Sequence, residues 1–120
     1  MNNYKSGKFS EFIARVYMRI LGFSIIHKNF YVGKGTHAGE IDFIAKKGKQ
    51  IVFVEVKKRK TLEEASYSIS RKQQERIIMG AKVFLQKCPQ YNFCEFRFDA
   101  ILISSFGRIK HIKNAWSLFT

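Results

Sequence analysis

The sequence predicts a single mixed α/β domain over residues 1–120, with the element order α-β-β-β-α-β-β. Three observations lead to this prediction. Apolar residues recur at helical spacing in 8–21 and again in 71–87. Runs rich in β-branched and aromatic residues, typical of strands, lie between and after these two segments. The second helix separates the third and fourth strands, as a parallel crossover requires, so we expect a mixed sheet flanked by helices.

The N-terminal half is expected to hold one helix and three strands. The helix over 8–21 ends at Gly22, a common stop residue. Its predicted inward face consists of Phe9, Phe12, Ile13, Val16, Tyr17, Ile20 and Leu21. Strands are expected over 23–31, 40–46 and 50–57, and the last two form an antiparallel hairpin around a tight turn.

The C-terminal half is expected to hold the second helix and two strands. Residues 58–70 are polar and predict a loop with a fragment of helix. The helix over 71–87 ends just before Pro89. Strands are expected over 95–104 and 108–112, and the tail that follows is expected to pack on the core through Trp116, Leu118 and Phe119.

The charge of the chain favours a polyanionic partner. Lys and Arg number 22 against 9 Asp and Glu, so the formal net charge is +13. Such a surface attracts nucleic acid by neutralising phosphates and releasing counterions. No apolar run approaches the roughly 20 residues of a membrane span, and no signal peptide is recognisable, so we expect a cytoplasmic protein without a membrane partner.

Two of the scarce acids stand inside the most strand-like runs. Asp42 lies within 40–45 and Glu55 within 51–57, where an uncompensated carboxylate is costly. Strand alternation places Glu55 and Lys57 on one face, and pairing across the hairpin can put Asp42 beside Glu55. The first helix, which carries Glu11, is expected to cover that side of the sheet.

This juxtaposition allows two interpretations. Adjacent carboxylates repel each other unless a cation joins them, and Mg²⁺ (or Mn²⁺) accepts such oxygen ligands. The ion would lower the pKa of a bound water, and Lys57 would orient that water or stabilise the phosphate. An ion pair of Lys57 with Asp42 or Glu55, without metal, accounts equally well for the spacing.

The remaining polar residues favour structural roles. Asp99 shares a strand face with Arg97 and is expected to form an ion pair with it. Glu40 lies at a strand start and is expected to be solvated or paired with a lysine. The histidines are scattered, and we expect them on the surface or in loops, at His27, His37 and His111.

The hairpin carries a resemblance to a known family. The segments are Gly39-Glu40-Ile41-Asp42-Phe43-Ile44-Ala45 and Val52-Phe53-Val54-Glu55-Val56-Lys57-Lys58-Arg59, supported by Asn29, Arg97-Phe98-Asp99 and Asn114-Ala115-Trp116. Together they resemble the PD-(D/E)XK nuclease superfamily. The closer similarity is to the YraN-like family of predicted endonucleases, which is related to archaeal Holliday junction resolvases. The resemblance covers nearly the whole chain.

The resemblance implies a restriction-endonuclease-like fold and a set of site residues. Asp42 and Glu55 would bind the metal directly, Glu11 directly or through water, and Lys57 would be the catalytic lysine. The second helix of the family commonly begins Lys-Gln, and Gln73-Gln74 stand there in this chain. Gln74 is therefore expected to supply the supporting polar contact. Expected nucleic-acid contacts are Lys34, His37, Lys58, Arg59, Lys72 and Arg76.

These observations predict a Mg²⁺-dependent endonuclease that hydrolyses phosphodiester bonds in DNA, with branched or processed DNA as one class of substrate. A nucleic-acid-binding protein with a vestigial nuclease site is the alternative. A third hypothesis is that the chain is an α/β protein that binds other proteins. A junction resolvase would need two active sites, so a homodimer stays open. The choice between DNA and RNA and the shape of the substrate are also open.

Overall fold

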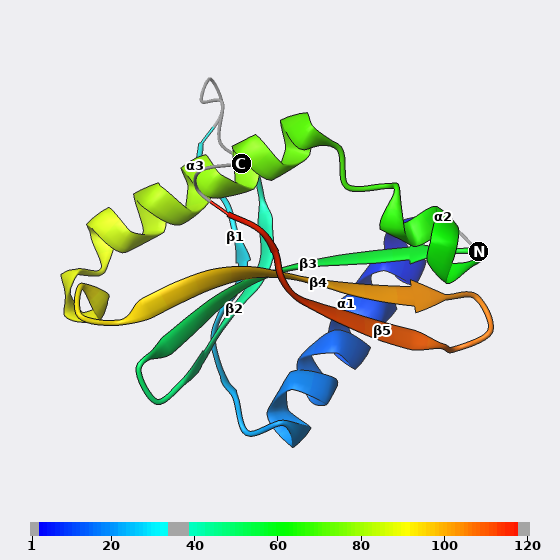
Figure 1. The fold of residues 1–120 in the computed structure, drawn as a ribbon, viewed down its shortest axis with the longest axis horizontal. Helices are drawn as coiled ribbons and strands as arrows, with labels where there is room; N and C mark the ends of the chain where they lie inside the picture. The colour runs from blue at the N-terminus through cyan, green and yellow to red at the C-terminus, as the bar shows by residue number, and fades with distance from the viewer. Residues whose placement is uncertain (1–2, 34–38, 118–120) are drawn as a thin grey trace.

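The computed structural model describes residues 3–33 and 39–117. These residues form a five-stranded sheet with helices on both faces (Figure 1). The strands lie in chain order, with β3 and β4 parallel and the other neighbours antiparallel. The elements are α1 (Asn3–Ile20), β1 (Ser24–Phe30), β2 (Ile41–Lys47), β3 (Gln50–Arg59), α2 (Leu62–Ser66), α3 (Arg71–Lys87), the 3₁₀ turn η1 (Pro89–Tyr91), β4 (Glu95–Ser104) and β5 (Ile109–Trp116). The predicted mixed α/β fold is confirmed, and α2 is the helical fragment expected within 58–70.

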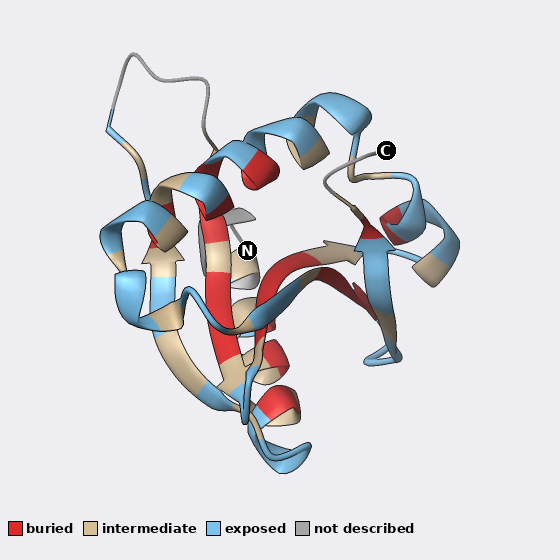
Figure 2. Cartoon of the chain, turned by 60° about the vertical axis from the view of Figure 1, so that its left-hand side comes forward, coloured by how far each residue is buried: buried red, intermediate tan, exposed pale blue. Residues whose placement is uncertain are grey.

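Each face of the sheet packs against one long helix. On one face, Ile77 and Phe84 of α3 join Phe53 of β3 in a buried cluster. On the other face, Ala14 and Met18 of α1 pack against the alternate residues of the same strand, such as Val52 and Val54. Strands β3 and β4 therefore carry long buried runs (Figure 2). Burial on both faces explains why their sequences are almost continuously apolar.

The inward face of α1 differs from the predicted one. The structure buries Ser10, Ala14 and Met18, which recur every four residues. Phe9 and Phe12, predicted to face inward, are 61% and 51% exposed. Ser10 and Ala14 have small side chains and Met18 fills the remaining contact with the sheet, while Phe9 and Phe12 lie toward solvent. The apolar pattern identified the helix correctly, and Ile13 and Tyr17 pack against the buried cluster as predicted. The stripe is, however, centred on Ala14 and Met18, and Phe9 and Phe12 lie outside it.

Strand β5 runs further than predicted and absorbs part of the tail. It ends at Trp116, whose ring is buried and stacks on Phe98 at a centroid distance of 5.7 Å. Its ladder with β4 shifts register between Phe98 and Ala100, and Asn114 adopts a positive φ of 53° in the same stretch. Leu118 and Phe119 lie outside the described residues.

In the described part of the chain, no helix is long and apolar enough to cross a membrane.

Candidate functional site

Asp42 and Glu55 lie side by side on the β2–β3 hairpin. Phe43 pairs with Val54 in the ladder, so the next position along puts Asp42 opposite Glu55, on the face that α3 covers. Their carboxyl groups are hydrogen-bonded to each other, and Oδ2 of Asp42 also accepts a hydrogen bond from the backbone N–H of Val56 at 2.7 Å. The structure thus brings together the two acids that strand alternation predicted to be neighbours.

The electrostatics of this pair are unfavourable for two ionised carboxylates. Burial and the adjacent Glu55 raise the pKa of Asp42 well above its ordinary value, against the opposing influence of the Val56 N–H and Lys57. Glu55 itself is only 4% exposed. Two acids held this close in a low dielectric favour a shared proton or a bound cation.

Glu11 borders the Asp42–Glu55 pair, although its helix packs on the other face of the sheet. The sequence predicted that its helix covers the face of Glu55, whereas α1 packs on the face of Val52 and Val54. This prediction was wrong because α3 occupies the Glu55 face. The N-terminal part of α1 nevertheless borders the site, and burial, together with the nearby Asp42 charge, raises the pKa of Glu11 to about 7.

A groove of about 960 Å³ joins these residues. It lies between the N-terminal parts of α1 and α3, across the end of the sheet where β2 begins and β3 ends. Four carboxylates line it, from Glu11, Glu40, Asp42 and Glu55. Five cationic side chains also line it, from Lys57, Lys58, Arg59, Lys72 and Arg76. Acidic and basic groups thus share one cavity, which suits a metal bound beside phosphate.

Gln73 contacts Glu55, and Gln74 does not. Nε2 of Gln73 donates to Oε2 of Glu55 at 2.7 Å. Nε2 of Gln74, predicted to make the supporting contact, donates instead to the carbonyl of Ile69 at 3.3 Å. Gln73 precedes the buried Ile77 by one helical turn, so it shares the sheet-facing side of α3, and Gln74 is rotated away from it. Gln73, and not Gln74, is therefore the amide that contacts the Asp42–Glu55 pair.

The comparisons with known proteins agree with one another. The family described as Uncharacterised protein family UPF0102 matches residues 10–103. A UPF0102 protein of Paramagnetospirillum magneticum is 37% identical over 114 residues, which cover 95% of this chain and 88% of that relative. A UPF0102 protein of Nitrobacter winogradskyi is 37% identical over 117 residues, covering 98% of this chain and 96% of the relative.

The chain belongs to the UPF0102 family. The matched region, residues 10–103, contains Glu11, Asp42, Glu55 and Lys57, together with Gln73. All the residues that line the groove, apart from Gly7, therefore lie within the region that matches the UPF0102 family.

Two glycines fix α3 over the groove in this UPF0102 chain. The backbone N–H of Gly39 donates to the carbonyl of Arg76 at 3.0 Å. A Cβ at Gly80 would lie 3.0 Å from the carbonyl oxygen of Gly39, and a Cβ at Gly39 would lie 3.0 Å from Cβ of Arg76. The chain entering β2 and the helix thus touch backbone to backbone. This contact was not predicted from the sequence, although a glycine inside an otherwise helical pattern, Gly80, is a signal that could have indicated it.

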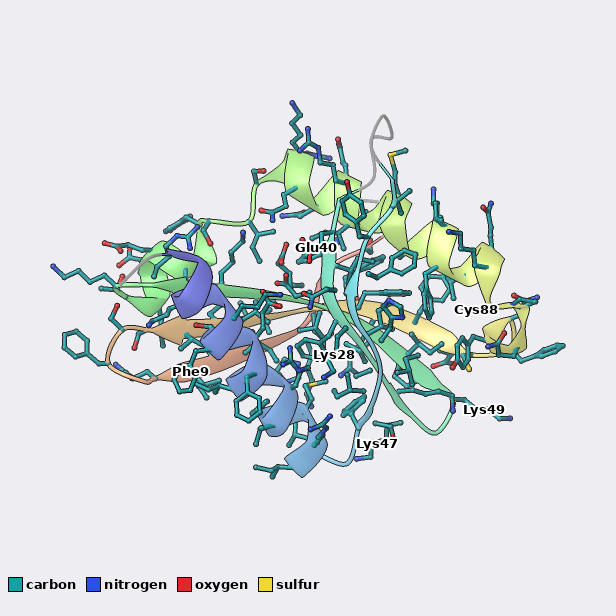
Figure 3. All side chains as sticks on the ribbon, turned by 180° about the vertical axis from the view of Figure 1, so that it is seen from behind. Phe9, Lys28, Glu40, Lys47, Lys49 and Cys88 are labelled. Atoms are coloured by element: carbon teal, nitrogen blue, oxygen red, sulfur yellow. The ribbon has the colours of Figure 1, made fainter. Side chains whose placement is uncertain are left out.

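The predicted nucleic-acid contacts divide into two groups. Lys58, Arg59, Lys72 and Arg76 line the groove, on β3 and α3. Lys34 and His37 lie outside the described residues. Lys47 and Lys49 lie at the far end of the hairpin from Glu40, which lines the groove (Figure 3). There, Nζ of Lys47 donates to the carbonyl of Leu21, just past the end of α1, at 2.8 Å.

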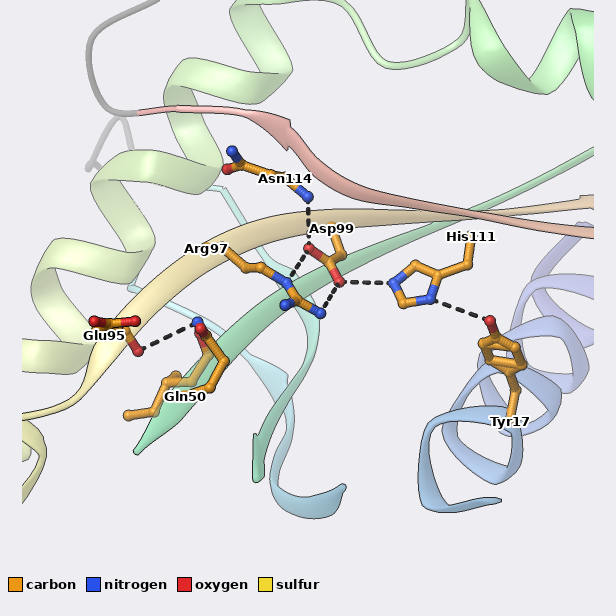
Figure 4. A network of polar contacts seen from close by, with 8 residues as sticks. Tyr17, Gln50, Glu95, Arg97, Asp99, His111 and Asn114 are labelled. Atoms are coloured by element: carbon orange, nitrogen blue, oxygen red, sulfur yellow. Dashed lines mark hydrogen bonds and ion pairs between the residues drawn. The ribbon is translucent and has the colours of Figure 1, made fainter. Parts of the chain in front are cut away.

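A second buried carboxylate, Asp99, lies on the α1 side of the sheet. Arg97 binds it through two hydrogen bonds of 2.9 and 3.1 Å, as the predicted ion pair requires (Figure 4). The backbone N–H of Asn114 donates to it at 2.9 Å, and Nε2 of His111 lies 2.7 Å away. His111 also contacts the Tyr17 hydroxyl at 3.2 Å, which links β5 to α1. The side chain of His111 is only 5% exposed, so its predicted surface position was wrong.

Asp99 is more fully compensated than Asp42. Burial alone would raise the pKa of Asp99, but hydrogen bonds from His111, Arg97 and Asn114 outweigh it and hold the pKa below its ordinary value. Among the residues that the structure describes, no three His, Cys, Asp or Glu side chains form a ready metal-binding group. A cation in the groove would therefore rest mainly on the Asp42–Glu55 pair.

Proposed function

We propose that this UPF0102 chain is a metal-dependent nuclease that hydrolyses phosphodiester bonds in nucleic acid, with DNA as its substrate. The observation that carries the proposal is the Asp42–Glu55 pair. Glu55 is buried and Asp42 is half-buried, and their carboxyl groups are hydrogen-bonded to each other. The pair is poorly compensated and lies in a groove with five cationic side chains. Lysine and arginine are abundant in this chain, yet none of them fully compensates Asp42 and Glu55. The pair therefore indicates a ligand that brings positive charge.

The donor set fits Mg²⁺ or Mn²⁺. Mg²⁺ binds through one or two carboxylates and keeps several waters or phosphate oxygens, so it does not need a ready group of three protein ligands. Asp42 and Glu55 would hold the ion, with Glu11 adding negative charge beside them. When bound, the cation would supply Lewis-acid polarisation of the phosphate and a water of lowered pKa.

The other groove residues would bind and orient the substrate. Lys57 places an ammonium near Asp42, where it can stabilise charge on the phosphate under attack. Lys58 and Arg59 on one wall and Lys72 and Arg76 on the other are placed to bind flanking phosphates. Hydrolysis consumes one water: its oxygen bonds to phosphorus, a P–O bond breaks, and the departing sugar oxygen takes up a proton.

Gln73 would hold Glu55 in place for this role. Its amide occupies Oε2 of Glu55 and leaves the other carboxylate oxygen for Asp42 or a cation. A neutral donor orients the acid without cancelling its charge. The resemblance of Asp42 and Glu55-Val56-Lys57 to the PD-(D/E)XK pattern supports the same assignment, because that pattern also comes from two adjacent strands.

A non-catalytic nucleic-acid-binding protein is the second candidate. The four cationic side chains on the groove walls favour it independently, because they can bind phosphates without a metal. Binding that weakens steeply with salt is common to both candidates. Only cleavage separates them.

The test is a panel of labelled DNA substrates in Mn²⁺: a four-way junction, a flap, a duplex and a single strand. The nuclease predicts cleavage of at least one substrate, slowed by roughly 10²-fold or more in Lys57→Ala. Salt-dependent binding without cleavage would instead establish the non-catalytic candidate. Cleavage at equal rates by wild type and Lys57→Ala would remove Lys57 from the mechanism.

A further inference from the structure

Asn29 occupies an unusual backbone position beside the groove. Its φ is +51°, in the left-handed region that asparagine tolerates better than other non-glycine residues. In the β1–β2 ladder, Lys28 pairs with Phe43 and Phe30 pairs with Ile41, so Asn29 stands opposite Asp42. The register of β1 shifts just before this point, between Ile25 and His27. The irregular strand therefore presents Asn29 next to a site acid.

The side-chain amide of Asn29 bridges two carboxylates. With its nitrogen turned toward them, the amide donates to Oε1 of Glu11 at 2.9 Å and to Oε1 of Glu40 at 3.2 Å. This orientation follows from the neighbours, because both are acceptors. One side chain thus connects α1, β1 and the residue before β2.

The chemistry of the bridge matters because the donor is neutral. A lysine or arginine here would neutralise Glu11 and Glu40 and compete with a metal ion. An amide fixes the positions of both carboxylates and leaves their negative charge intact. The chain has 22 Lys and Arg against 9 Asp and Glu, and yet the donor at this point is neutral. This choice of residue favours a role in which Glu11 and Glu40 keep their negative charge.

We propose that Asn29 is a positioning residue that holds Glu11 and Glu40 toward Asp42 and thereby sets the affinity of the groove for a divalent cation. Glu40 thereby joins the site as a fourth acid, although its place at a strand start suggested a solvated or lysine-paired role. The inference rests on the cation of the proposed function, but it does not depend on cleavage.

Calorimetric titration of the full chain with Mn²⁺ alone tests this role. Asn29→Gly keeps the positive φ accessible and removes the amide, so we expect the fold to be retained. We expect Asn29→Gly to weaken Mn²⁺ binding by about tenfold, the lower end of the range for residues that orient metal ligands. Asn114→Gly is the matched control: it also replaces an asparagine at positive φ, on an exposed position of β5. It should change Mn²⁺ affinity by less than about twofold, since its side chain orients no ligand.

A coupled variant separates positioning from a general structural effect. In a Glu11→Gln/Glu40→Gln background the bridge has lost both charged acceptors, so adding Asn29→Gly should then weaken Mn²⁺ binding by less than about twofold. Glu40→Gln alone, at an exposed position, should weaken binding measurably and tests the proposal even if Asn29→Gly folds poorly.

The outcomes distinguish this inference from the nuclease. Wild-type affinity in Asn29→Gly or in Glu40→Gln, or an undiminished loss in the doubly substituted background, overturns the role of Asn29. Mn²⁺ binding that depends on Asn29, without cleavage of any DNA, supports the positioning role and removes the nuclease. Absence of Mn²⁺ binding by the wild-type chain overturns both.

Discussion

The two buried carboxylate regions of this chain show opposite electrostatics. Asp99 accepts hydrogen bonds from Arg97 and from the backbone of Asn114 and contacts His111, and its pKa is lowered. Asp42 has a second acid as its side-chain partner, and its pKa is raised. Both lie in the same sheet, so burial alone does not explain the difference. Asp99 is placed to stabilise the fold, and Asp42 is placed at a cost to stability that a ligand can relieve.

The first prediction removes the compensated acid. Asp99→Asn removes the negative charge beside Arg97 and His111 and replaces one acceptor oxygen with an amide nitrogen, which faces their donor groups. We expect it to lower the free energy of unfolding by about 3 kcal/mol, as measured by urea denaturation. Glu95→Gln, an exposed acid on the same strand, is the control and should change stability by no more than about 0.5 kcal/mol. Equal effects from the two substitutions would contradict a stabilising role for the Asp99 network.

The second prediction disturbs only the groove side. Ala at Gly80 would place a Cβ 3.0 Å from the carbonyl oxygen of Gly39, so α3 must shift outward. We expect Gly80→Ala to cost about 2 kcal/mol of stability. Gly7→Ala, in α1, meets no atom within 4 Å and should instead stabilise the helix by about 0.5–1 kcal/mol. Thermal unfolding of both variants measures the two changes in stability. If both variants were stabilised, or both destabilised, the Gly39–Gly80 contact would not be the tight one that the structure shows.

The third prediction neutralises the uncompensated acid. Asp42→Asn removes the repulsion with Glu55 while its amide oxygen can still accept from the Val56 N–H. We expect a gain of about 1 kcal/mol in unfolding free energy at neutral pH, with loss of Mn²⁺ binding. A clear loss of stability, similar to that of Asp99→Asn, would mean that Asp42 stabilises the fold in the same way as Asp99.

The smallest expected effect is the pH dependence of stability. The pKa of Glu11 is raised to about 7 from 4.5, so its folded-state protonation stabilises the protein fully below pH 4.5, and this stability is lost as the pH rises through 7. For Asp99 the sign is reversed: its lowered pKa gives stability above 3.8 that is lost as the pH falls through the folded value. The free energy of unfolding in urea is measured at pH 5 and pH 8 for the wild type and Glu11→Gln. The decrease from pH 5 to pH 8 should be smaller in Glu11→Gln by about 1 kcal/mol, after allowance for solvent screening.

Much of the fold and the central pair followed from periodicity. The bounds of α3 and β4 match the predicted 71–87 and 95–104, because caps and turn residues mark their ends. The alternation of side chains along a strand predicted that Asp42, Glu55 and Lys57 share one face of the sheet. These features depend on local sequence, which is why they were predictable.

The failures depend on tertiary packing. The rotation of α1 about its axis determines the side from which Glu11 approaches the groove, and this rotation depends on which residues of the helix contact the sheet. The choice of Gln73 over Gln74 depends on how α3 docks. The bridge made by Asn29 needed the irregular register of β1, and the burial of His111 needed the pairing of β5 with β4. None of these has a periodic signature in the sequence.

The most direct measurement of the central claim is a calorimetric titration of Mn²⁺ into the wild-type chain and Asp42→Ala, at pH 7 in two buffers with different heats of ionisation. The uncompensated Asp42–Glu55 pair predicts binding by the wild type, a heat that differs between buffers because protons are released as the cation binds, and no binding by Asp42→Ala. Failure of the wild-type chain to bind Mn²⁺, or equal binding by Asp42→Ala, would contradict the assignment of the groove as a cation site.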